Sequence, residues 1–66
     1  MRREEYGNVC FRTVQQYEQV PLMNNRTGKV GYTYGCTYTG ETVEVRLENG
    51  DIDTWGRDEC SEVIIH

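Results

Sequence analysis

The residues best suited to chemistry in this sequence are three cysteines and one histidine. Cys10, Cys36 and Cys60 stand 26 and 24 residues apart, and His66 is the last residue. These four side chains form a Cys₃His set that Zn²⁺ accepts, but structural zinc sites use closely spaced ligand pairs such as CxxC. The sequence contains no such pair, so it predicts neither a metal nor another cofactor.

The number of cysteines also indicates their redox state. An odd and sparse set is atypical of small secreted domains, which several disulfides hold together. We therefore expect reduced thiols in a cytoplasmic protein, with no intramolecular disulfide. Cys36 falls on the predicted buried face of a strand, where a free thiol packs as a small apolar side chain.

Catalysis by side chains is not expected. A serine or cysteine nucleophile needs a neighbouring base, and the only histidine is the terminal one. Two carboxylate pairs are present, Asp51 with Asp53 and Asp58 with Glu59. The first pair flanks a turn on the predicted solvent face, where carboxylates serve solubility. The sequence therefore predicts a non-catalytic protein.

The elements that must position these residues are short β-strands. The 66 residues form one small domain, 1–66, and include no alanine, the residue that most favours helix. Valine, isoleucine, threonine, tyrosine, phenylalanine and tryptophan, which favour strands, supply 24 residues. Seven glycines and one proline mark turns. This composition predicts an all-β domain, either a small sandwich or a barrel.

The charge balance limits the partners of such a domain. Eleven acidic and seven basic residues give a net charge of −4, which disfavours binding to a nucleic-acid backbone. No apolar run approaches the length of about 18 residues that a transmembrane helix needs. We therefore expect a protein partner and no contact with a membrane.

Two turns define a predicted meander between Lys29 and Trp55. Asn49-Gly50 is typical of a two-residue hairpin turn, and Gly40-Glu41 fits a turn of type II′. The turns predict three antiparallel strands at about 30–38, 42–48 and 51–56, with one buried face and one solvent face. The predicted buried face holds Tyr34, Cys36, Tyr38, Val43, Val45, Leu47, Ile52 and Thr54.

The N-terminal part of the chain fits two kinds of element. Residues 1–8 are polar and expected to be frayed. Residues 9–20 show the apolar alternation of a strand, but the spacing of a helix is also present. That helical spacing joins Tyr6, Cys10, Val14 and Tyr17. The β-branched side chains and Gly7 favour a strand.

The order of the predicted elements resembles an SH3-like small barrel. The elements are a strand Tyr17–Met23, a polar loop Asn24–Gly28, the meander Lys29–Trp55, a 3₁₀ turn Arg57–Cys60 and a closing strand Ser61–Ile65. The phrase from Val43 to Asp51 is similar to the central hairpin of Tudor- and KOW-type barrels. The resemblance implies a barrel of about five antiparallel strands over residues 17–65, with an extra N-terminal strand or helix.

Trp55 is the strongest candidate for a binding residue. The predicted register places it on the solvent face beside Glu44, with Thr37 one strand further. Tryptophan is a typical centre of protein interfaces, and the resemblance implies a ligand groove near this end of the sheet. The leading hypothesis is a protein-interaction module. The alternative for Trp55 is structural, with the N-terminal segment covering the ring or a bulge turning it inward.

Tyr32, Arg26 and Lys29 form a second candidate surface. An aromatic ring beside a few cations can bind nucleic acid by stacking. These residues would suit a Tudor- or KOW-like nucleic-acid contact module in transcription or translation, as the resemblance implies. A third hypothesis is a structural subunit that forms a homodimer, and burial of Trp55 would favour it.

Overall fold

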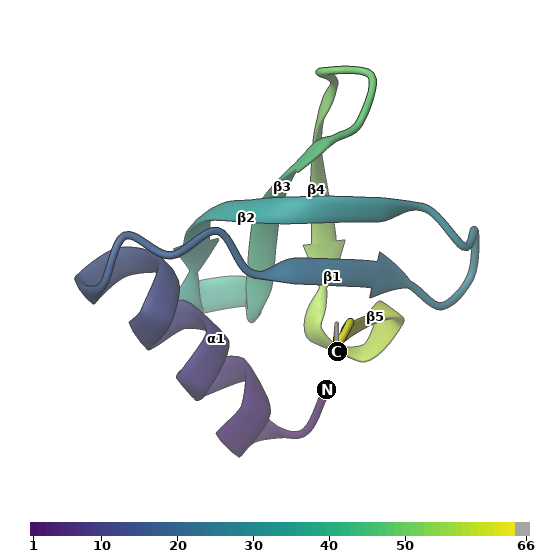
Figure 1. Ribbon diagram of the computed structural model, residues 1–66. Helices are drawn as coiled ribbons and strands as arrows, with labels where there is room; N and C mark the ends of the chain where they lie inside the picture. Colours follow the sequence, from purple (N-terminus) through teal and green to yellow (C-terminus); the bar gives the residue numbers. More distant parts are fainter. Residues whose placement is uncertain (65–66) are drawn as a thin grey trace.

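One helix and five strands form the domain, and the computed structural model describes residues 1–64 (Figure 1). The elements are α1 (Arg3–Gln15), β1 (Pro21–Asn24), β2 (Val30–Thr37), β3 (Thr42–Leu47), β4 (Ile52–Gly56) and β5 (Cys60–Glu62). Every strand pairs antiparallel with its neighbours in a single sheet of order β4-β3-β2-β1-β5. The β-rich class and the meander are confirmed. The sheet of the described residues is open, because its two end strands do not pair with each other.

The elements that flank the meander lie close to their predicted positions. The first strand begins at Pro21 rather than Tyr17, and a 3₁₀ turn covers Arg57–Glu59. The closing strand Cys60–Glu62 is shorter than the predicted Ser61–Ile65. Ile65 and His66 lie outside the described residues. No helix within residues 1–64 is long and apolar enough to span a bilayer.

Residues 3–15 form a helix, so the strand that was favoured for residues 9–20 is wrong and the helical alternative is correct for residues 9–15. The buried side chains of α1 recur at helical spacing and pack mainly on β2. They are Tyr6, Val9, Cys10 and Thr13. Phe11, which completed the apparent strand alternation, is exposed. The helical period decides the structure because it gives α1 one continuous face to bury.

The helix also orders part of the segment that was expected to be frayed. It begins at Arg3, and Glu4 and Glu5 occupy its first turn, where acidic side chains favour the positive end of the helix dipole. The amino group of Met1 donates hydrogen bonds to the carbonyl oxygens of Arg57 (2.6 Å) and Cys60 (3.1 Å). These contacts fix the start of the chain against the 3₁₀ turn before β5.

The turn between β3 and β4 contains three residues, not the predicted two. The Leu47 amide donates to the Asp51 carbonyl at 2.8 Å, and Gly50 has a φ of +91°. This geometry is typical of a three-residue hairpin turn whose glycine takes the left-handed conformation. The extra residue shifts the register by one, so that Arg46 faces Ile52 and not Asp53.

That shift moves Trp55 to the other face of the sheet. Trp55 pairs with Val43 and is 3 % exposed, whereas Ile52, predicted to be buried, is 51 % exposed. The predicted solvent-face position of Trp55 is therefore wrong. A one-residue slip exchanges the two faces of a strand because its side chains alternate with a period of two.

The register between β2 and β3 also differs from the predicted one, because of a bulge and a longer turn. The pairing passes from Thr33 opposite Val45 to Gly35 opposite Glu44, which leaves Tyr34 as the extra residue. A 3₁₀ turn at Tyr38–Gly40 replaces the predicted two-residue turn, and Glu41 is left-handed with φ +51°. Both tyrosines predicted to be buried, Tyr34 and Tyr38, are exposed.

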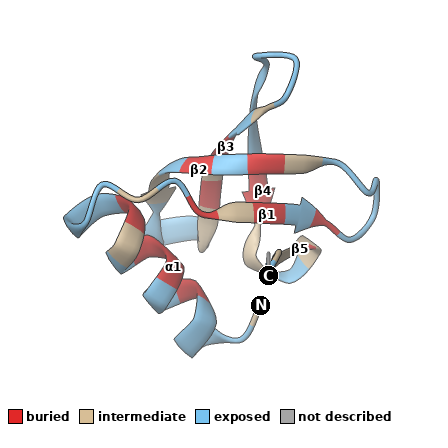
Figure 2. Ribbon diagram, viewed as in Figure 1, coloured by how far each residue is buried: buried red, intermediate tan, exposed pale blue. Residues whose placement is uncertain are grey.

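The core lies between α1 and the inner face of the sheet. Figure 2 shows buried positions on α1 and on the strands. The buried cluster contains Val9, Val20, Leu22, Val43, Val45, Trp55 and Cys60. Leu47 and Cys36 pack against it from partly buried positions, so both keep a place on the inner face despite the changed register.

The new register predicts opposite effects for two substitutions on β4. Trp55→Ala removes a buried indole and should lower the free energy of unfolding by about 3–5 kcal/mol. Ile52→Ala removes an exposed side chain and should lower it by less than about 1 kcal/mol. Urea unfolding followed by circular dichroism measures both. A larger loss for Ile52→Ala than for Trp55→Ala would contradict the register.

Candidate interaction surface

The predicted site around Trp55 is not assembled. Its indole Nε1 donates to Asp53 Oδ2 at 2.9 Å, and its ring belongs to the buried cluster that includes Val9 of α1. The structural alternative for Trp55 is therefore the correct one. Glu44 and Thr37 remain together on the outer face, where the Thr37 hydroxyl donates to Glu44 Oε1 at 2.7 Å.

Arg26 and Lys29 lie at the loop between β1 and β2. Asn24 Oδ1 shapes this loop by accepting hydrogen bonds from the backbone amides of Arg26 (2.9 Å) and Thr27 (3.1 Å). The Arg26 guanidinium is 3.9 Å from a Glu59 carboxylate oxygen. Lys29 borders a hollow of about 390 Å³ that Glu48 also lines. Neither Arg26 nor Lys29 lines the hollow beside Tyr32, so the described residues do not bring the three predicted residues together there.

Three exposed tyrosines lie next to one another on a different surface. Tyr32 and Tyr34 point outward from β2, and Tyr17 lies in the segment between α1 and β1. Two hollows of about 320 Å³ and 180 Å³ adjoin, because Gln19, Thr33 and Tyr34 line both. We call the group Tyr17, Gln19, Tyr32 and Tyr34 the tyrosine face.

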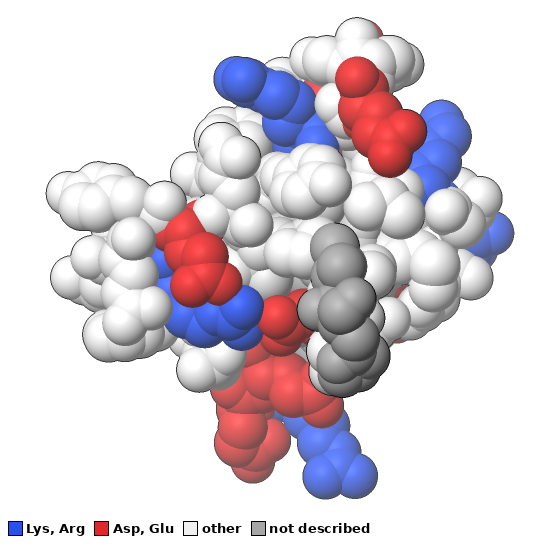
Figure 3. All heavy atoms as spheres, in the orientation of Figure 1, with Lys and Arg blue, Asp and Glu red and all other residues white. Residues whose placement is uncertain are grey.

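The surroundings of the tyrosine face are mostly uncharged. Pro21 of β1 lies directly opposite Tyr32, and Met23 lies opposite Val30. Figure 3 shows an uncharged centre over β1 and β2, with the charged side chains nearer the edges. Arg46 and Glu48 line the larger hollow, and Glu18 lines the smaller one. An aromatic centre with a charged rim is a common composition of protein-binding surfaces.

Tyr17 has an unusual backbone for an aromatic residue. Its φ is +54°, and its side chain is 89 % exposed. A left-handed conformation costs a residue other than glycine about 1 kcal/mol or more, so it persists only where neighbouring contacts hold it. Here the Glu18 amide donates to the Arg12 carbonyl at 2.9 Å, which fixes the chain directly after Tyr17.

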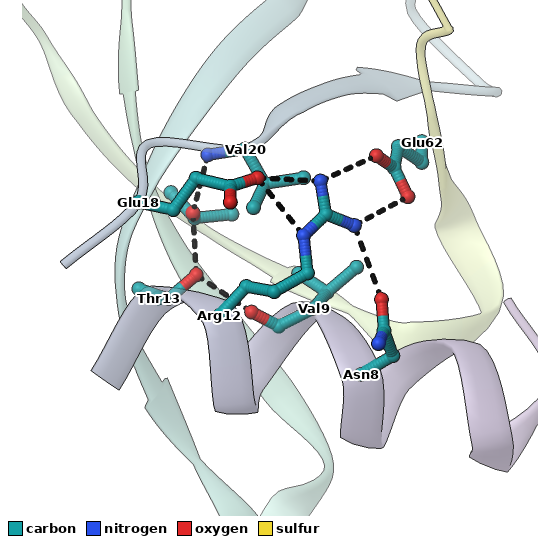
Figure 4. A network of polar contacts seen from close by, with 8 residues as sticks. Asn8, Val9, Arg12, Thr13, Glu18, Val20 and Glu62 are labelled. Carbon is teal, nitrogen blue, oxygen red and sulfur yellow. Dashed lines mark hydrogen bonds and ion pairs between the residues drawn. The ribbon is translucent and has the colours of Figure 1, made fainter. Parts of the chain in front are cut away.

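Arg12 holds this segment to the helix and to β5 (Figure 4). Its guanidinium donates to Glu18 Oε2 from Nε at 2.9 Å and to both carboxylate oxygens of Glu62 at 3.0 and 3.1 Å. Nη1 also donates to Asn8 Oδ1 at 3.1 Å. The hydrogen bonds to Glu62, and then those to Glu18, raise the pKa of Arg12 above its usual value.

A buried chain of hydrogen bonds connects α1, the segment before β1, and β2. The Thr13 hydroxyl donates to the Val9 carbonyl at 2.8 Å, so the 2.7 Å contact between Thr13 and Thr33 is donated by Thr33. Thr33 Oγ1 in turn accepts from the Val20 amide at 3.0 Å. Every donor in this chain has an acceptor, as buried polar groups require.

A disulfide provides the covalent link between the same two elements. Cys10 of α1 is bonded to Cys36 of β2, with a Cα–Cα distance of 5.9 Å. The expectation of reduced thiols without an intramolecular disulfide is therefore wrong. Two of the three cysteines form the disulfide, and the third, Cys60, is free and buried. The bonded pair cannot serve as thiolate ligands, and His66 lies outside the described residues.

The tyrosine face was only partly visible in the sequence. Tyr32 was singled out, but Tyr34 was assigned to the core because the predicted turns placed it on the buried face, and the bulge that changes this register was not predicted. Tyr17 was placed at the start of a predicted strand and at helical spacing from Val14, but it lies between α1 and β1 and belongs to neither. The one available signal was the pair of tyrosines two residues apart in β2, since residues at this spacing share a face.

Comparisons with known proteins do not identify a relative of this chain. The sequence matches no protein-family model, and neither curated proteins nor solved structures give a significant match.

The contacts of Arg12 predict a specific loss of stability. Arg12→Gln leaves the Glu18 and Glu62 carboxylates without their shared cation and should lower the free energy of unfolding by about 2–3 kcal/mol. The matched control Arg46→Gln, at an exposed position, should change it by less than about 0.5 kcal/mol. Equal effects of the two variants in urea unfolding would contradict a structural role for Arg12.

The buried thiol of Cys60 predicts a pH dependence. Burial raises its pKa from 9.0 to about 11, so the folded protein retains a proton that the unfolded chain releases. Its contribution to stability is complete below about pH 9 and is lost as the pH rises towards 11. The free energy of unfolding should therefore fall less steeply above about pH 9 in Cys60→Ala than in the unsubstituted protein. Parallel pH profiles of the two proteins would show that Cys60 does not contribute.

Proposed function

We propose that this protein is a non-catalytic interaction module that binds an extended peptide segment of a partner protein at its tyrosine face. The observation that carries the proposal is the placement of three exposed tyrosines around two adjoining hollows. Tyrosine offers a large contact area with few rotatable bonds, so it binds at low entropic cost. Exposed apolar patches on small proteins commonly mark such interfaces.

The support beneath this surface favours a pre-organised site. Tyr32 pairs with both β1 and β3, and Tyr34 lies in the bulge between Thr33 and Gly35, which both pair with β3. The Arg12 contacts and the chain of hydrogen bonds through Thr33 hold the segment that carries Tyr17 and Gln19. A surface that is ordered before binding loses less conformational entropy when the partner arrives.

The fold-level part of the proposal is an SH3-like arrangement. The strand order β4-β3-β2-β1-β5 and the 3₁₀ turn before β5 support it, although the sheet is open. Small barrels of this kind serve many unrelated tasks, so the function rests on the tyrosine face and not on the fold.

The charge of the surface favours a peptide over a nucleic acid. Glu18 and Glu48 line the hollows together with a single cation, Arg46, and the whole chain carries a net charge of −4. Phosphate groups would be repelled by this arrangement. Arg26, which the nucleic-acid hypothesis needs, already has Glu59 as a partner.

The predicted cytoplasmic location rested on reduced thiols. The Cys10–Cys36 disulfide favours either an oxidising compartment or a protein whose disulfide forms and breaks in the cell.

Selection of peptides from a display library tests the proposed function. Peptides selected on the oxidised protein should lose at least about tenfold in affinity for Tyr34→Ala, because truncated aromatic interface residues cost about 1.4 kcal/mol or more. Phe11→Ala, an exposed aromatic on α1 outside both hollows, is the matched control and should change affinity less than about twofold.

Two results would count against peptide binding at this face. One is the failure of the library to yield any binder, and the other is equal affinity of the selected peptides for Tyr34→Ala and the unsubstituted protein. A melting temperature that rises with protein concentration and loses that dependence in Tyr34→Ala would assign the face to a second copy of the chain instead, as in the homodimer hypothesis.

A further inference from the structure

The disulfide joins α1 and β2, and both elements line the smaller hollow. Its lining consists of Thr13 of α1, Thr33 and Tyr34 of β2, and Tyr17, Glu18 and Gln19 of the segment after α1. Cys10 lies in α1 and Cys36 in β2. A movement of α1 relative to β2 therefore changes the shape of this hollow, which is part of the tyrosine face.

The helix depends on tertiary contacts for its position. A helix of 13 residues is marginal by itself in water, and α1 includes Gly7 and the β-branched residues Val9, Thr13 and Val14, which lower helix propensity. Its N-terminal half is held by the Tyr6 hydroxyl, which is within hydrogen-bond distance of the Thr42 (2.7 Å) and Thr37 (3.2 Å) carbonyls.

The C-terminal half of α1 buries Cys10 and Thr13, and the disulfide is its covalent link to β2. Beyond the disulfide, Thr13 makes one hydrogen bond to β2, and Arg12 makes its ion pairs at the partly exposed surface. This is the half of α1 that leads directly into Tyr17. Opening of the disulfide therefore removes the covalent contact that holds the end of the helix nearest to the tyrosine face, and leaves the hydrogen bonds of Arg12 and Thr13.

Solvent thiols can reach the disulfide through one of its two residues. Cys10 is fully buried, whereas Cys36 is half-buried. A thiolate of a dithiol attacks Cys36 Sγ, the S–S bond breaks, and its electron pair passes to Cys10 Sγ, which takes up a proton. The second thiol then attacks the mixed disulfide and releases the Cys36 thiolate, which is protonated. The protein gains two electrons and two protons, and the reductant leaves as a disulfide.

We propose that the Cys10–Cys36 disulfide is a redox control on the tyrosine face. In the oxidised protein it holds α1 against β2 and keeps the wall formed by Tyr17 and Gln19 in place. Reduction loosens the C-terminal half of α1, and peptide binding weakens. This regulation rests on the proposed function of the tyrosine face, but the movement of α1 does not require a ligand and is measured separately.

Hydrogen exchange of the backbone amides, with and without dithiothreitol, measures the movement. Reduction should lower the protection of residues 10–15 at least about tenfold, with a much smaller change in β3, because local openings differ between elements. The affinity of peptides selected on the oxidised protein should fall at least about tenfold in dithiothreitol.

The double variant Cys10→Ala/Cys36→Ala is the control for the reductant. It retains Cys60, so any effect of dithiothreitol through that thiol remains visible. The variant should resemble the reduced protein under both conditions and show no response to dithiothreitol. A response of similar size in the variant would overturn the assignment to this disulfide.

The remaining outcomes also decide the proposal. Unchanged protection of α1 after complete reduction, verified by mass, would overturn it. Equal loss of protection in α1 and β3 would overturn it too, because the disulfide would then stabilise the whole domain and not one wall. If the library yields no peptide, the proposed function fails, while exchange in residues 10–19 still confirms or refutes the redox control of this segment.

Discussion

The burial of Trp55 beneath α1 is the contact on which the rest of the structure depends. A sheet of five short strands has an inner face that must be covered, and 66 residues leave few side chains to cover it. Trp55, on the end strand β4, joins the buried cluster that also contains Val9 of the helix. The position of Trp55 follows from a single glycine, because the left-handed Gly50 sets the length of the β3–β4 turn and hence the register of β4.

The pairing of β2 with β3 determines which side chains lie on the outer face of the sheet. Tyr32 and Tyr34 of β2 are exposed there. The bulge after Thr33 adds Tyr34 to this outer face, next to the segment that contains Gln19. The burial of Trp55 thus depends on the β3–β4 pairing and the tyrosine face on the β2–β3 pairing. The helix α1 contributes to both, because Val9 belongs to the core and Thr13 lines the smaller hollow.

The sequence was sufficient for some features and not for others. The strands of the meander, the polar loop and the 3₁₀ turn at Arg57 follow from local residue types, because glycine and asparagine accept the left-handed backbone of turns and proline fixes φ. Register does not follow in this way, since Asn49-Gly50 fits both a two-residue and a three-residue turn. The helix was missed because Val9 and Thr13 satisfy both periods, and the disulfide because pairing between Cys10 and Cys36 needs the fold first.

The two buried threonines also constrain how this domain can change over generations. The hydroxyl groups of Thr13 and Thr33 each donate one hydrogen bond and accept one, so each connects two partners. Loss of the Thr33 hydroxyl would strand the Val20 amide and the Thr13 oxygen at once. Loss of the Thr13 hydroxyl would strand only the Thr33 proton. Substitution of Thr13 should therefore be tolerated more readily than substitution of Thr33 as the sequence diverges.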